Sequence, residues 1–206
     1  MHFNVATPLD TALWGTMSIT IGILWLITAL GVGLVFFQKL PNRVLSWSIR
    51  LGFLITLLGF AQGFLMTSPN ATQLAALQAG QQVDLIGAHT VGRTDGGPGM
   101  LLLGWSTTHG DLRIGHFIGI HAMQAIPLFG VMLLRRRERW LSERTRLAWL
   151  CIGAASYFGL MLLVTWQALR GQPLFSPDPL TMVAGAVLLI AALGTALLFV
   201  PRTYLE

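Results

Sequence analysis

Residues 111–127 (DLRIGHFIGIHAMQAIP) carry the side chains of this chain that are best suited to chemistry. At 100° per residue, Arg113, His116, His121 and Gln124 fall within one helical arc of about 140°. The roughly opposite side carries small residues that let another helix approach closely, namely Gly115, Gly119 and Ala122. The segment therefore predicts a helix with one polar face and one packing face, with a kink at Pro127.

A ligand pocket is the first function that these residues suggest. Polar groups at membrane depth usually face the interior of a helical bundle. Gln62 lies at a comparable depth in an earlier apolar segment. We expect a polar pocket that opens outward and binds a small or lipid-like ligand, a transported solute or a membrane partner. Its predicted ligand-binding residues are Arg113, His116, His121, Gln124 and Gln62.

A metal or haem site is the alternative, because neutral imidazole is a common ligand of zinc, copper and haem iron. His116 and His121 are separated by five positions, so their side chains diverge by about 140° on a helix. A transition-metal or haem site would therefore need further histidines from outside this helix. The candidate ligands are His116, His121, His109 and His89, with His2 as another histidine on the same side. The favoured hypothesis is that the histidines form hydrogen bonds and bind no metal.

Catalysis has little support in the sequence. Asp111, near His109 and His116, is the one candidate acid–base cluster, and an Asp at a helix start is more often an N-cap. The chain has no HExxH motif and no serine-hydrolase motif. We assign no catalytic residue. A third hypothesis is an accessory or structural membrane subunit that packs through small residues such as Gly52, Gly59 and Gly63.

The composition indicates a membrane protein that would position these residues on helices. Of 206 residues, 54% are hydrophobic and 10% charged, against roughly 25% charged in soluble domains. A bilayer-spanning helix needs about 20 mostly apolar residues. We predict one domain over residues 1–206, an all-α bundle of about five transmembrane helices. The predicted spans are 13–37, 46–66, 114–134, 147–167 and 180–200.

Lysine and arginine predict the orientation of the spans. Arg93, Arg113 and Arg170 fall on one side, and the others fall on the opposite side: Lys39, Arg43, Arg50, Arg135, Arg136, Arg137, Arg139, Arg144, Arg146 and Arg202. Because positive loops stay in the cytoplasm, we expect the N-terminus outside and the C-terminus inside a bacterial-type inner membrane. The net charge of +5 follows this loop pattern, so the expected partners are the lipid bilayer and a membrane protein or a second copy, with no nucleic acid.

A long outer loop, residues 67–113, joins the second and third predicted spans. Ser68-Pro69 predicts a helix start, residues 70–82 a short amphipathic helix, and Gly80 its end. The remainder combines turn formers with apolar residues, which predicts a folded cap over the outer side of the bundle.

Residues 2–10 (HFNVATPLD) and 105–124 (WSTTHGDLRIGHFIGIHAMQ) resemble segments of an uncharacterised family of bacterial multi-spanning membrane proteins. The resemblance covers nearly the whole chain. In that family the segment like residues 2–10 follows further N-terminal spans, so this chain resembles a short form or a fragment. The resemblance implies a membrane location and no activity.

Overall fold

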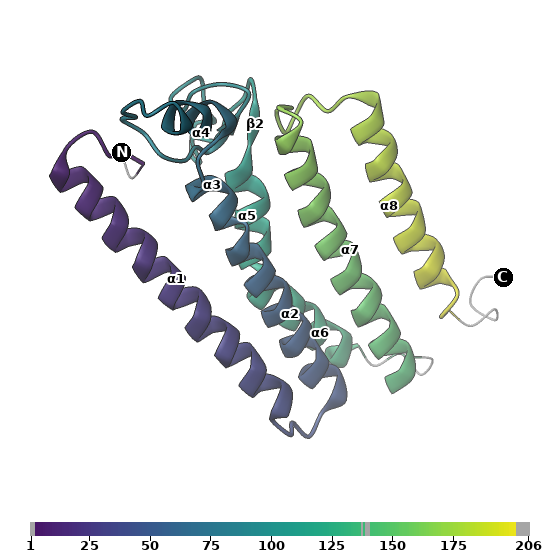
Figure 1. Ribbon diagram of the computed structural model, residues 1–206. Coiled ribbons are helices and arrows are strands. Elements are labelled where there is room, and N and C mark those ends of the chain that lie inside the picture. The colour runs from purple at the N-terminus through teal and green to yellow at the C-terminus, as the bar shows by residue number, and fades with distance from the viewer. Residues whose placement is uncertain (1–2, 137, 139–140, 201–206) are drawn as a thin grey trace.

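Helices dominate the chain because long apolar runs are flanked by capping residues. The computed structural model describes residues 3–136, 138 and 141–200 (Figure 1). Thr7, Asn42, Asn70, Asp111, Ser142 and Asp178 each cap a helix N-terminus through the side chain. The helices are α1 Pro8–Phe37, α2 Arg43–Ala61, α3 Gly63–Thr67, α4 Ala71–Gln78, α5 Leu112–Ile120, α6 Ala122–Arg135, α7 Glu143–Leu169 and α8 Pro179–Leu197.

The helices confirm the prediction of an all-α bundle. In the part of the chain that the structure describes, four helical segments are long and apolar enough to cross a membrane: α1, α2 with α3, α7 and α8. The pair α5 and α6 makes a fifth if it is counted as one bent span. The described residues therefore form four to five long apolar helices, as expected of a membrane protein.

The centre of the bundle is built by α2, α5, α6 and α7, while α1 packs on α2 and α8 packs on α7 at the two flanks (Figure 1). The main apolar cluster joins α2, α6 and α7 through Val44, Ile55, Ala122, Ile126, Leu133, Leu150, Ala154 and Met161. The flanking helices expose most of their large apolar side chains, for example Leu30 at 71% and Ile190 at 69%. Such surfaces suit an apolar surrounding.

Glycine permits a close backbone contact between α2 and α5. A Cβ atom added to Gly59 would overlap the backbone of Gly119, and one added to Gly119 would overlap Gly59. Only a residue without a side chain lets the two backbones come this close.

The helix formed by α5 and α6 bends by 45° at His121, six residues before the proline at which a kink was predicted. The break is stabilised from neighbouring helices. The Thr56 hydroxyl donates to the carbonyl of Ile120 at 3.3 Å and accepts from the amide of Met123 at 2.9 Å. The Tyr157 hydroxyl donates to the carbonyl of Ile118 at 2.7 Å. This bend was not predicted from the sequence, because side chains of α2 and α7 replace helix hydrogen bonds there. A kink at Pro127 stays a prediction.

The segment between α3 and α5 folds over one end of the bundle. It contains α4 and a two-stranded antiparallel sheet of β1 Thr90–Val91 and β2 Gly110–Asp111. The predicted short helix is present, but its N-cap is Asn70 and not Ser68. Asn70 and Gln73 form a reciprocal capping box, which fixes the start two residues later than predicted.

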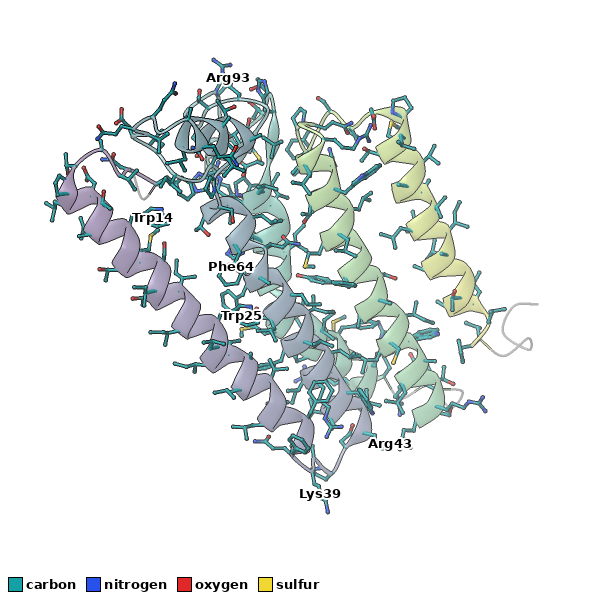
Figure 2. All side chains as sticks on the ribbon, in the orientation of Figure 1. Trp14, Trp25, Lys39, Arg43, Phe64 and Arg93 are labelled. Carbon is teal, nitrogen blue, oxygen red and sulfur yellow. The ribbon has the colours of Figure 1, made fainter. Side chains whose placement is uncertain are left out.

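At the opposite end of the bundle, two arginines bind backbone carbonyls at helix C-termini. The Arg50 guanidinium donates to the carbonyls of Phe36 and Gln38 at the end of α1, and Arg146 donates to the carbonyls of Leu133 and Arg136 at the end of α6. A cation at a helix C-terminus satisfies free carbonyls and offsets the helix dipole. Lys39 and Arg43 lie at this end, and Arg93 lies at the end that carries the loop (Figure 2).

We expect Gly59→Ala to lower the unfolding free energy by about 1–3 kcal/mol, because the new methyl group has no space between α2 and α5. Thermal unfolding of the detergent-purified protein measures the change. Gly194→Ala on α8 is the matched control, because among the described residues no atom beyond its chain neighbours and the nearby backbone of α8 lies within 4 Å of its Cβ position. A Gly59 variant as stable as this control would show that the close contact does not matter.

Candidate functional site

His116 is fixed by the close approach of α5 to α2. Its Nδ1 lies 2.8 Å from the carbonyl oxygen of Gly59. A carbonyl can only accept, so Nδ1 carries the proton, and in the neutral ring Nε2 is left as an acceptor. Nε2 makes no hydrogen bond with any residue that the structure describes.

A cavity of about 230 Å³ lies beside His116, between α1 and the central helices. Its walls are mostly apolar side chains from four elements and the N-terminal segment: Phe3, Met17, Ile21, Leu24, Trp25, Phe60, Gly63, Met66, Thr67 and His116. The Thr67 hydroxyl donates to the carbonyl of Gly63, and the Trp25 ring N–H donates to the carbonyl of Leu57 at 3.2 Å. His116 is therefore a polar residue of the cavity wall, and its Nε2 atom lacks a partner within the described part of the chain.

The cavity lies between two attachments of the N-terminal part of the chain, one just before α1 and one at the middle of α1. At the loop end, the backbones of Phe3 and Val5 are hydrogen-bonded to Ile86 and Asp84. In the middle, Trp25 bonds to α2 and contacts Phe64 edge-on, with ring centroids 6.0 Å apart. Between these attachments α1 runs apart from α2 (Figure 1). The cavity fills the space that this divergence leaves.

Two further polar groups without partners lie on α1. The ring N–H of Trp14 and the hydroxyl of Ser18 are buried and have no hydrogen bond with any described residue. Figure 2 shows Trp14 and Trp25 on the side of α1 that faces α2 and α3. Buried polar groups are normally hydrogen-bonded, so this side of α1 offers further places for a polar partner.

Arg113 does not line the cavity, and its side chain binds the loop between α3 and α5. Its guanidinium bonds to both carboxylate oxygens of Asp111, at 3.0 and 2.6 Å, and to the carbonyl of Gly104 at 2.7 Å. Asp111 is fully buried and also accepts from the backbone amide of Ser106. This predicted N-cap is confirmed by its bond to the amide of Arg113. The pair ties the loop to the start of α5.

Gln62, at the end of α2, is buried away from the cavity, against Gly115 and Thr165. A Cβ atom on Gly115 would lie 2.8 Å from Gln62 Oε1 and would overlap the Thr165 hydroxyl. Gln62 Oε1 is buried without a hydrogen bond. The glutamine therefore fills the junction of α2, α5 and α7.

His121 and Gln124 lie on the outer side of the bent helix. His121 Nδ1 lies 2.7 Å from the carbonyl oxygen of Phe117, and the two rings are 4.0 Å apart. Gln124 is exposed. The structure thus places His116 at the cavity and does not bring Arg113, His121, Gln124 or Gln62 to it. Their ligand-binding role stays a prediction.

The loop histidines are occupied by local contacts. His89 Nδ1 lies 3.0 Å from a carboxylate oxygen of Asp95, and His109 Nδ1 lies 3.0 Å from the Thr108 hydroxyl. Burial works to raise the pKa of Asp95, but hydrogen bonds from the backbone amides of His89 and Thr90 outweigh it and hold the pKa below its ordinary value. His2 lies outside the described residues. Among residues 3–136, 138 and 141–200, no three His, Cys, Asp or Glu side chains are placed to hold a metal ion.

The cavity was not predicted, because its walls resemble surfaces that face lipid. Met17, Ile21 and Leu24 are ordinary residues of an apolar helix, and their spacing carries no mark of a cavity. A possible signal was Trp25, a large aromatic residue in the middle of a predicted span.

Comparison of the chain with protein-family models, curated proteins and solved structures found no match. The functional argument therefore rests on the site itself.

We expect Asp111→Asn to lower the unfolding free energy by about 2–3 kcal/mol. The asparagine amide would point an N–H group at N–H donors from which the carboxylate now accepts hydrogen bonds. Arg113 would also lose its counter-ion. Denaturant or thermal unfolding in detergent measures the change. Glu143→Gln, which affects an exposed ion pair with Arg43, is the control with little expected effect. Equal stability of the two variants would contradict the role given to Asp111.

Proposed function

We propose that the chain is a multi-pass protein of a bacterial-type inner membrane that crosses the bilayer five times. The four long apolar helices and the bent pair α5–α6 support five spans. The side with Lys39, Arg43 and Arg146 is cytoplasmic, in accordance with the preference of positive loops for that side. The N-terminus and the loop that contains α4 then lie outside.

We propose further that the cavity beside His116 binds a small, mostly apolar molecule. Its apolar walls favour a hydrocarbon or aromatic body. Its position between the flanking helix α1 and the centre of the bundle allows entry from the lipid phase, where such molecules concentrate. A volume of about 230 Å³ accepts a small molecule or the end of a longer one.

The observation that carries this proposal is that His116 lines an apolar cavity while its Nε2 acceptor has no partner among the described residues. A hydrogen bond made inside low-dielectric surroundings is stronger than one made in water, and an unmet polar atom there is costly. The preferred ligand therefore offers one hydrogen-bond donor, such as a hydroxyl group, to His116 Nε2. The cavity has no charged side chain among its described walls, so the ligand carries no full charge at this point.

A pair of brominated probes tests the ligand class. We expect 4-bromophenol to quench the tryptophan fluorescence of the purified protein at roughly two- to tenfold lower concentration than 4-bromoanisole, its methyl ether. The ratio corresponds to one net hydrogen bond of about 0.5–1.5 kcal/mol. His116→Leu should remove the preference for the phenol and keep the binding of the ether.

Two variants serve as controls. His121→Leu alters a histidine on the outer side of the helix and should keep the preference. Gly63→Phe should weaken both probes, because its side chain would enter the cavity next to His116. Quenching that is the same in the Gly63 variant and in the unchanged protein would reflect partition into detergent and would overturn the proposal.

A further inference from the structure

An exposed stripe runs along α5 and α6, on the side away from α2. Its exposed residues are Phe117, Gln124, Leu128 and Met132, with His121 partly exposed between the first two. The buried side of the same helices carries Gly119, Ala122, Ile126 and Gly130 and packs against the bundle. The stripe therefore lies on the outer surface of the bundle.

Gln124 is out of place on such a stripe if the helix crosses a membrane. It lies midway between Leu112 and Arg135, the ends of the bent pair, and so near the centre of the proposed bilayer. Its side-chain amide makes no hydrogen bond within the described chain. A polar side chain at this depth is costly against lipid and normally faces protein.

His121, one helical turn away, has a second polar atom without a hydrogen bond in the described chain. Its Nδ1 donates to the carbonyl of Phe117, which leaves Nε2 as an acceptor without a partner in the described chain. The stripe thus offers an amide donor, an amide acceptor and an imidazole acceptor, surrounded by apolar side chains. Hydrogen bonds between such side chains stabilise helix association in membranes.

We propose that this stripe is the interface between two copies of the chain. A glutamine amide both donates and accepts, so it is complementary to itself. Two copies related by a two-fold axis present the same patch to each other, and Gln124 of one copy can bond to Gln124 or His121 of the other. The inference needs insertion into a membrane and is independent of the ligand cavity.

Photobleaching of single fluorescently labelled molecules of the full chain in lipid vesicles measures the association. We expect dimers whose dissociation constant rises roughly three- to tenfold in Gln124→Leu, the range expected for one hydrogen bond between membrane helices. Gln124→Asn, which keeps the amide, should restore part of the affinity. Thr195→Leu, at an exposed polar position on α8, is the matched control and should not change it.

Cysteine cross-linking locates the interface. In a Cys151→Ser background, Leu128→Cys should form a disulfide between copies faster than Leu189→Cys. The two leucines are exposed to 61% and 59%, so chance collisions would oxidise them equally. Under conditions in which both are monomeric, Gln124→Leu should unfold at the same temperature as the unchanged protein, since its side chain has no bond within the described chain. Monomers at every protein density, or equal cross-linking at the two positions, would overturn the proposal.

Discussion

The close contact between α2 and α5 at Gly59 and Gly119 is the constraint on which the remaining structure depends. It brings the carbonyl of Gly59 within reach of the His116 ring and Thr56 within reach of the broken turn at His121. Larger residues at the two glycines would move α5 outward and remove both interactions. The contact therefore fixes the tautomer of the histidine at the cavity and the position of the bend in one step.

The bend at His121 separates residues that a continuous helix would have kept on one face. His116, before the bend, faces the cavity beside α1. Gln124, after the bend, is exposed on the outer side of α6. Polar residues of one segment thus lie at two places, a cavity towards α1 and an exposed stripe on the outer side. At each place one polar group has no partner within the described part of the chain.

Sequence periodicity was enough to predict helices where apolar runs are long. Residue type alone predicted the N-cap at Asp111. The sequence could not locate the bend, because Thr56 and Tyr157, which stabilise it, come from distant parts of the chain. Nor could it predict that Arg113 is engaged by Asp111 and the loop, since a ligand and an internal carboxylate are equivalent partners for a guanidinium. Of the five predicted ligand-binding residues, the cavity includes His116 because that position alone faces the space between α1 and α2.

Whether the chain crosses a membrane with its loop outside is tested most directly by labelling single cysteines with a membrane-impermeant maleimide. The protein would be produced in a bacterial inner membrane in a Cys151→Ser background, with Arg93→Cys in the loop or Lys39→Cys between α1 and α2 (Figure 2). Labelling of position 93 in intact spheroplasts, and of position 39 only after the membrane is permeabilised, is the predicted result. Labelling of both positions before permeabilisation, or of position 39 alone, would contradict the proposed arrangement.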